Sequence, residues 1–286
     1  MKINKNMKIL IIGLGLIGGS YASILSKKGY EVGAITLNKD DIDYAINNNI
    51  IKHGQVKVSK KYISKFDVVI FALYPKTFVE FIKKYHSYFK QNAIISDVSG
   101  VKESIVYQIQ DMLSGDNVEF IACHPMAGKE VSGVKNASVD MFKNANFIIT
   151  PTNKNTNEAI EFASSLAHEL EFLNISTLSV EKHDEMIAFL SQLTHCIAIS
   201  LMTCNDSTHL KDYTGDSFRD LTRIANINEN MWSELFLLNK DKLIEQMELF
   251  EKQFELLKNY IKTEDVENMK EMMKLSTYRR SHFNKK

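Results

Sequence analysis

Apolar and polar positions in the first 178 residues alternate between two periods. Short runs that are apolar throughout, such as 7–12 and 67–73, are typical of strands covered on both faces. The segments between them, such as 17–28, carry apolar residues at helical spacing. The predicted strands are 7–12, 31–36, 67–73, 93–96, 118–123, 146–150 and 171–178, and the predicted helices are 17–28, 39–48, 75–89, 101–113 and 155–170. This α/β alternation predicts a doubly wound, mostly parallel sheet of the Rossmann type.

Beyond about residue 179 the pattern becomes helical only. The predicted helices there are 180–204, 229–260 and 264–277. We therefore expect two domains, a dinucleotide-binding domain over 1–178 and an all-α domain over 179–286. Long apolar helices with no sheet to cover favour a homodimer formed through this second domain, and a self-contained bundle is the alternative.

Charge and cysteine content limit the partners of the chain. It has 35 basic and 35 acidic residues among 286, so it has no bulk attraction for nucleic acid or for an anionic membrane. The three cysteines show no metal-ligand spacing and suit a reducing cytosol. The apolar stretch 9–12 is too short for a signal or membrane segment. We expect a cytoplasmic protein that acts on a small molecule.

A glycine-rich motif follows the first predicted strand and opens the first predicted helix. It reads Gly13-Leu14-Gly15-Leu16-Ile17-Gly18 and fits G-x-G-x-x-G. The first glycine allows a tight turn, the second lets a pyrophosphate approach the backbone, and the third lets helix and strand pack closely. The phosphates then meet the helix N-terminus. This context predicts dinucleotide binding, with Ala72, Leu73 and Asp97 at the ends of neighbouring strands as further cofactor contacts.

The choice between NAD and NADP depends on the end of the second strand. NAD sites usually place an acid there for the ribose 2′-hydroxyl, but this chain has Thr36, with no acid before Asp40. Only Lys39 offers a nearby positive charge for a 2′-phosphate. NAD is the favoured cofactor, and NADP stays open.

The pentapeptide His124-Pro125-Met126-Ala127-Gly128 directly follows the predicted strand 118–123. Open α/β sheets hold their ligands at the carboxyl ends of strands. An imidazole at this point can take a proton near neutral pH. A structural histidine before a turn is the alternative interpretation.

Further segments form an ordered series that resembles the prephenate and arogenate dehydrogenases of tyrosine biosynthesis. The resemblance covers about residues 7 to 240. It rests on the glycine motif, His124-Pro125-Met126-Ala127-Gly128 and the segments Asp97-Val98-Ser99-Gly100-Val101-Lys102, His183-Asp184, Ser191-Gln192-Leu193-Thr194-His195, Phe218-Arg219-Asp220-Leu221-Thr222-Arg223-Ile224-Ala225 and Met231-Trp232. In such enzymes, hydride leaves C4 of a cyclohexadiene for the nicotinamide while the ring carboxylate departs as carbon dioxide.

The resemblance implies roles for individual side chains. His124 matches the histidine that accepts a hydrogen bond from the substrate 4-hydroxyl, and His195 matches a histidine that contacts substrate. Arg223 matches an arginine that binds a substrate carboxylate, which a guanidinium can grip bidentately. Glu130 matches an acid at the pocket mouth, and Asp220 would hold Arg223 or its loop.

The chain also departs from the family pattern. Ser99-Gly100 replaces the usual Gly-Ser, so Ser99, or a water, would have to supply the hydroxyl that links cofactor, substrate and histidine. Gln192 stands where a second histidine is common, and Lys129 replaces a frequent Thr or Ser. We expect Gln192 and Lys129 to contact substrate.

The resemblance leaves the substrate open. Lys129 and His195 favour prephenate, which ends in a keto acid, whereas Glu130 would suit the ammonium of arogenate. Two other classes stay open. Hydroxy-acid dehydrogenases that use a catalytic lysine on the first helix of the second domain are disfavoured, because Lys182 lies only at its start. A nucleotide sensor with a decayed site would have no need for His124 together with Arg223.

Overall fold

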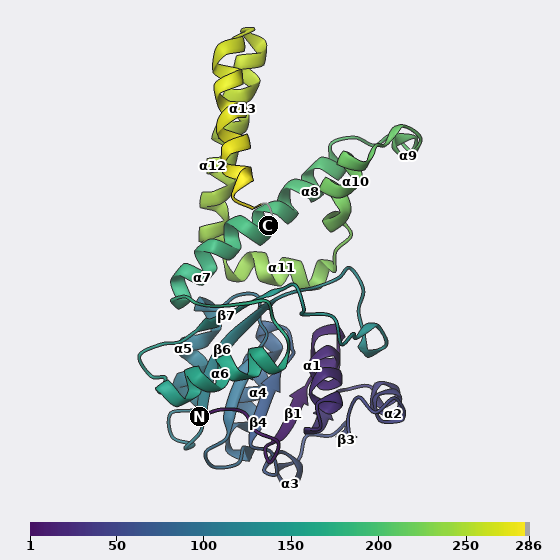
Figure 1. The fold of residues 1–286 in the computed structure, drawn as a ribbon, viewed down its shortest axis with the longest axis vertical. Helices are drawn as coiled ribbons and strands as arrows, with labels where there is room; N and C mark the ends of the chain where they lie inside the picture. The colour runs from purple at the N-terminus through teal and green to yellow at the C-terminus, as the bar shows by residue number, and fades with distance from the viewer. Residues whose placement is uncertain (284–286) are drawn as a thin grey trace. The chain divides into compact units, whose positions relative to one another are not determined.

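The computed structural model describes residues 1–283 (Figure 1). They form two compact units, Met1–Asn239 and a second unit that begins at Lys240. The domain boundary predicted near residue 178 lies inside the first unit and stays a prediction.

A mixed sheet of eight strands forms the centre of the first unit. Its strands are β1 (Lys8–Ile12), β2 (Glu31–Ile35), β3 (His53–Gln55), β4 (Val68–Phe71), β5 (Ile94–Asp97), β6 (Glu119–Met126), β7 (Asn146–Thr150) and β8 (Asn174–Thr177). Their order is β3-β2-β1-β4-β5-β6-β7-β8. The strands from β3 to β6 are parallel, β7 runs antiparallel to β6, and β8 is parallel to β7. The predicted fold class is confirmed, although the short strand β3 was missed.

Helices cover both faces of this sheet. They are α1 (Leu16–Lys27), α2 (Lys39–Asn47), α3 (Lys60–Ile63), α4 (Pro75–Tyr85), α5 (Glu103–Met112) and α6 (Asn157–Glu169), with short 3₁₀ turns at His86–Tyr88 and Val134–Asn136. Helices α1, α2 and α6 pack on one face, where their apolar residues join Ile9 and Ile11 of β1. Helices α3, α4 and α5 pack on the other, with Leu10 and Ile12. Alternate residues of β1 therefore enter two separate cores, as the pleat requires.

The rest of the first unit is helical and reaches the carboxyl-terminal edge of the sheet (Figure 1). It comprises α7 (Val180–Ile187), a π-helical turn (Ala188–Leu193), α8 (Thr194–Thr203), α9 (Leu210–Tyr213), α10 (Asp216–Thr222), a 3₁₀ turn (Arg223–Ala225) and α11 (Glu229–Leu238). The continuous helix predicted over 180–204 thus contains a π-turn. The single helix predicted over 229–260 is wrong, because it is interrupted at Asn239. The side chain of Asn239 is buried and donates hydrogen bonds to other helices of this unit.

The second unit contains α12 (Lys240–Lys262) and α13 (Val266–Ser281). Many of its large apolar side chains are exposed in the single chain, including Leu249, Phe254, Ile261, Leu275 and Tyr278. Exposed apolar side chains on both helices make this unit a candidate interaction surface.

The stretch Val180–Thr203 is long and apolar enough, by length and composition alone, to cross a membrane, and core helices of soluble proteins pass the same test. Three of its polar residues, His183, Asp184 and Gln192, are buried and hydrogen-bonded to other elements of the first unit. These bonds make the stretch part of the packed structure around the site described below.

Candidate active site

The glycine motif forms the turn between β1 and α1. Gly13 has φ of +100°, and a Cβ there would lie 2.3 Å from the carbonyl oxygen of Ala72. A Cβ on Gly18 would lie 2.0 Å from the carbonyl oxygen of Gly13 and 2.9 Å from the Ala72 side chain. The turn therefore packs directly against the end of β4. In sheets with this strand order, the crevice between these two strand ends is where dinucleotides bind.

Gly15 differs from the other two glycines of the motif. No atom lies within 4 Å of the position where its Cβ would be, and no side chain caps α1 at this residue. The first backbone N–H groups of α1 are thus available to an anionic ligand. The side chains of Leu14 and Leu16 are buried. Leu14 and Leu16 therefore stabilise the loop from inside and offer a cofactor only their backbone, whereas Ile17 is partly exposed.

The end of β2 carries the residues considered for recognition of the ribose 2′ position. Thr36 is partly buried, and its N–H donates to the carbonyl of Gln55. Lys39 is exposed and pairs with Asp43 one turn later in α2. The positive charge considered for a 2′-phosphate is therefore already engaged on the surface of α2.

A buried ion pair supports the strand ends. The Lys102 ammonium donates to both carboxylate oxygens of Asp97, at 2.9 and 2.8 Å, and to the carbonyl of Cys123. Asp97 also accepts the N–H groups of Cys123 and Ser99. This network ties β5 to β6 next to His124. Its completeness matters, because a buried charge is costly unless it is paired and hydrogen-bonded.

His124 lies within β6, whose antiparallel pairing with β7 continues past it to Met126. Its Nδ1 is 2.9 Å from Nε2 of His183, and Nδ1 of His183 is 2.7 Å from Oδ1 of Asp184. The Asp184 carboxylate also accepts the backbone N–H groups of Lys102 and Glu103. A chain of hydrogen bonds thus runs from the start of α5 through α7 to the histidine on β6.

The acceptor at the start of this chain fixes its direction. An ionised carboxylate only accepts, so His183 carries its proton on Nδ1. Neutral His183 then accepts at Nε2, and His124 must donate from Nδ1. Nε2 of His124 is left as an acceptor. We assign these tautomers from the hydrogen-bond partners.

Both histidines are held in the neutral form. Burial lowers the pKa of His124 well below 6.5, and the nearby His183 and Lys102 lower it further. Burial also lowers the pKa of His183, and the hydrogen bond to Asp184 opposes this only in part. At neutral pH His124 therefore presents an unprotonated Nε2.

Gly100, rather than Ser99, faces this nitrogen. A Cβ on Gly100 would lie 3.8 Å from Nε2 of His124 and 3.7 Å from the side chain of Leu235 in α11. The Ser99 hydroxyl is buried and has no hydrogen-bond partner among residues 1–283. The structure therefore gives Ser99 no contact with His124, and its predicted catalytic role has no geometric support.

His195 lies on α8 and stacks on the indole of Trp232, with ring centroids 3.6 Å apart. Its Nδ1 donates to the Ser191 carbonyl at 2.8 Å, which leaves Nε2 as an acceptor. Burial is the main cause that lowers the pKa of His195, while Glu130 and Arg223 act on it in opposite directions. His195 thus lies in the electrostatic field of two other predicted site residues.

Arg223 forms an ion pair with Glu130 across 93 residues of sequence. The Arg223 side chain remains 64% exposed, so it keeps surface with which to bind an anion. Lys129 and Asp220 are exposed, and Arg223 pairs with Glu130 rather than with Asp220. Asp220 therefore does not hold the guanidinium in this arrangement.

Both the nitrogen and the oxygen of the Gln192 side-chain amide are hydrogen-bonded inside the protein. Its Nε2 donates to the carbonyl of Leu235 at 2.9 Å, and its Oε1 accepts from Asn239 at 2.8 Å. Asn239 also donates to the backbone carbonyl of Asp184. Nothing in the sequence singles out Asn239, since an asparagine inside an apparently helical stretch signals only a weak helix former.

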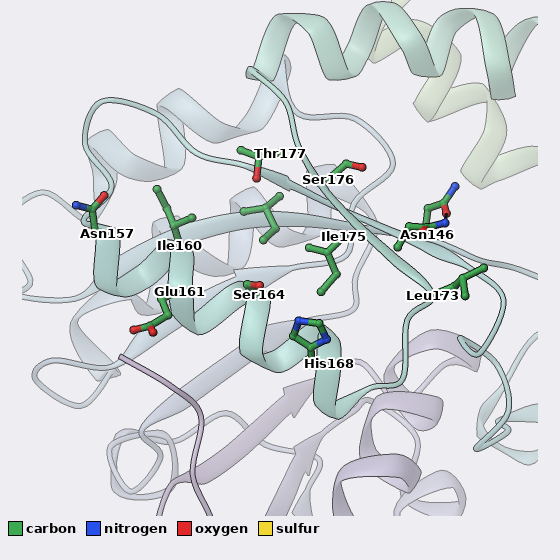
Figure 2. Close-up of a pocket in the computed structure, with 12 residues that line it drawn as sticks. Asn146, Asn157, Ile160, Glu161, Ser164, His168, Leu173, Ile175, Ser176 and Thr177 are labelled. Atoms are coloured by element: carbon green, nitrogen blue, oxygen red, sulfur yellow. Dashed lines mark hydrogen bonds between the residues drawn. The ribbon is translucent and has the colours of Figure 1, made fainter.

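A separate hollow of about 950 Å³ lies between α6 and the edge strand β8. Figure 2 shows His168, Ser164 and Ile160 of α6 directed towards β8. Its lining residues are Asn146, Ile149, Asn157, Ile160, Glu161, Ser164, His168, Leu173, Asn174, Ile175, Ser176 and Thr177. The hollow includes none of the predicted site residues, and we assign the candidate active site to the region around His124.

Comparisons with known families match both parts of the chain. Residues 21–172 match the model of the prephenate dehydrogenase nucleotide-binding domain, and residues 179–275 match that of the prephenate dehydrogenase dimerization domain. The chain is 30% identical to prephenate dehydrogenase of Bacillus subtilis over 276 residues, which cover 91% of this chain and 72% of that protein. It is 27% identical to cyclohexadienyl dehydrogenase of Zymomonas mobilis, over 94% of this chain and 93% of that protein.

The fold has close structural counterparts. A crystal structure of prephenate dehydrogenase from A. aeolicus, in complex with hydroxyphenyl propionate and NAD⁺, superposes with a TM-score of 0.88. The match covers 97% of this chain and 98% of that one at 28% identity. The similarity therefore extends through the nucleotide crevice and the helices that follow it.

Proposed function

Because the chain belongs to the prephenate dehydrogenase family, we propose that it converts prephenate to 4-hydroxyphenylpyruvate and carbon dioxide, with NAD as the oxidant. The observation that carries this proposal is the hydrogen-bond chain from Asp184 through His183 to His124, which leaves Nε2 of His124 unprotonated. An enzyme that oxidises an alcohol carbon needs an acceptor for the hydroxyl proton.

Each site residue then has a task in this reaction. NAD, when bound in the crevice at Gly13–Gly18, supplies the acceptor for the hydride that leaves C4. Nε2 of His124 accepts the proton of the 4-hydroxyl as that oxygen becomes a carbonyl. The C1–carboxylate bond breaks to release carbon dioxide, its electron pair completes the aromatic ring, and the C4 carbonyl oxygen becomes a phenolate that takes the proton back from Nε2 of His124. A positioned general base of this kind contributes about 10²–10⁴-fold to the rate.

Arg223 and His195 are proposed to bind the substrate. The exposed guanidinium of Arg223 can exchange its ion pair with Glu130 for a substrate carboxylate. His195 presents Nε2 as an acceptor when neutral. Lys129 adds an exposed positive charge to the same loop as Glu130. Prephenate carries a net charge of −2 and arogenate one of −1, so the cations Arg223 and Lys129 favour prephenate, while Glu130 would suit the ammonium of arogenate.

NAD is proposed over NADP. Thr36 can hydrogen-bond a ribose hydroxyl, and Lys39, the lysine considered for a 2′-phosphate, lies beside the opposing charge of Asp43. The structural relative from A. aeolicus was solved with NAD⁺.

A homodimer is also proposed, in the cytoplasm. The exposed apolar side chains of α12 and α13 and the match of residues 179–275 to a dimerization domain support it. Light scattering coupled to size-exclusion chromatography should give twice the 32.7 kDa mass of the chain. A monomer at micromolar concentration would contradict this part of the proposal.

The direct test is NADH formation at 340 nm with prephenate and arogenate, each with NAD and NADP. We expect the highest kcat/KM with prephenate and NAD. Faster reduction with arogenate would reassign the substrate. Nucleotide binding without turnover in all four mixtures would contradict the enzyme and favour the sensor.

The pH dependence of kcat/KM tests the state of His124. Because burial lowers the pKa of His124, its base form persists as pH falls through 6.5. We therefore expect the acid limb of the profile well below pH 6.5. A limb at or above 6.5 would show that an ordinary, solvated group controls the reaction.

A further inference from the structure

The π-turn Ala188–Leu193 lies between the two histidines that the long helix brings to the site. His183 and His195 are twelve residues apart. In a regular α-helix, with about 100° per residue, they would point about 120° apart around the axis. A π-turn, with its i→i+5 hydrogen bonds, takes up about one extra residue and reduces this angle to about 20°. The turn therefore places both histidines on one side of the helix.

Two buried amides hold this turn against α11. Gln192 is part of the π-turn, and its amide donates to the carbonyl of Leu235 and accepts from Asn239. Asn239 ends α11 and also donates to the carbonyl of Asp184, one residue after His183. One asparagine thus joins α7, which precedes the π-turn, to the π-turn itself.

The same contacts position the ring of His195. Ser191, within the π-turn, accepts from Nδ1 of His195, which fixes its tautomer. Trp232, on α11, stacks on the imidazole. Because Gln192 and Asn239 fasten α11 to the turn, they also hold Trp232 in register with His195.

We propose that Gln192 and Asn239 are positioning residues, which lock the π-turn to α11 so that His183 and His195 face the site together. This assigns Gln192 an internal role in place of the substrate contact predicted from its position in the sequence. The proposal rests on the proposed function only for its effect on turnover. The arrangement of His195 can be measured without substrate.

Trp232 is the single tryptophan of the chain and provides that measurement. A protonated imidazole stacked on an indole quenches its fluorescence, so the emission should report protonation of His195. Glu130 and Arg223 are the charged groups that act on this histidine. We expect wild-type emission to fall in one step below pH 6.5, and His195→Asn to lack the step.

The test compares Asn239→Ala and Gln192→Met with the control Asn230→Ala, an exposed asparagine on the same helix α11. Both buried variants should lose the fluorescence step or shift it towards pH 6.5. Their kcat/KM with prephenate should fall about 10–100-fold, the scale of a misplaced site residue. Binding of NAD, measured by calorimetry, should match wild type and show that the nucleotide domain is folded. The control should keep the step and the activity.

Deletion of Leu190, an exposed residue of the π-turn, provides a second variant. It should restore regular α-helical bonding with the two histidines eleven residues apart, which keeps the angle between them at about 20°, so the fluorescence step should persist. The proposal is overturned if Asn239→Ala keeps both the step and the activity, or if wild type shows no step. A wild type that shows the step but turns over no substrate would instead contradict only the proposed function.

Discussion

The nucleotide crevice and the histidine site hold their geometry by different means. At the crevice, the turn depends on side chains that are missing, because a Cβ on Gly13 or Gly18 would collide with backbone atoms. At the histidine site, the geometry depends on buried polar side chains that satisfy one another, from Asp184 to His124. A site that binds through backbone groups tolerates substitution of the surrounding side chains but not of its glycines. A polar network fails at whichever member is removed.

His124→Asn should separate the two regions most strongly. Removal of the imidazole should lower kcat with prephenate by about 10²–10⁴-fold, since the general base is lost. Binding of NAD should stay unchanged, because the crevice contributes none of these side chains. Stopped-flow or steady-state absorbance at 340 nm measures the first effect and calorimetry the second. His168→Asn, an exposed histidine on α6, is the matched control. A tenfold weaker binding of NAD in His124→Asn would show that the two regions are not independent.

Lys102→Met tests the support beneath the histidine site. The change leaves the buried Asp97 carboxylate without its ammonium and should lower the free energy of unfolding by about 3–5 kcal/mol. Urea denaturation followed by circular dichroism measures it. The exposed Lys57→Met should change stability little. Equal stability of the two variants would mean that the Asp97–Lys102 pair contributes nothing net.

Gly18→Ala tests the crevice in the same way. The new methyl group would lie 2.0 Å from the Gly13 carbonyl oxygen, so the turn must shift. We expect the free energy of unfolding to fall by about 1–3 kcal/mol, as overpacking usually causes, together with weaker binding of NAD. Gly115→Ala, where no atom lies within 4 Å of the new Cβ, is the control. Unchanged affinity in Gly18→Ala would show that close packing at this turn is not required for the nucleotide.

Gly100→Ser, beside His124, should change kcat least among these variants. The Cβ fits without overlap, 3.8 Å from Nε2 of His124, and brings a hydroxyl to that nitrogen. One added hydrogen bond is worth about 0.5–1.5 kcal/mol, so kcat should rise about 2–10-fold. Ser99→Ala should leave kcat unchanged, because the hydroxyl makes no hydrogen bond in the described structure. The opposite result, with Ser99→Ala inactive and Gly100→Ser silent, would return the role to Ser99.

The difference between the regions also explains what the sequence could predict. Strands covered on both faces and a glycine turn leave local signals, so β1, the turn at Gly13 and α1 were predicted within one or two residues. The hydrogen-bond chain joins residues 60 positions apart, and neither period nor propensity reveals which imidazole nitrogen faces which partner.

The helical half shows the same limit. The π-turn and the break at Asn239 both occur where side chains bond across helices, and a helical pattern passes through them without interruption.

The short strand β3 was missed because its sequence, His53-Gly54-Gln55, has no apolar run. The pairing of Arg223 with Glu130 is set by tertiary packing and has no local signal.

The central claim is that Asp184, acting through His183, keeps Nε2 of His124 unprotonated. Nitrogen-15 NMR of histidine-labelled protein at pH 7 tests it directly, with His124→Asn and His183→Asn to assign the signals. We expect a neutral His124 whose proton is on Nδ1 and whose Nε2 resonates as an unprotonated nitrogen. A proton on Nε2, or a doubly protonated ring at this pH, would contradict it.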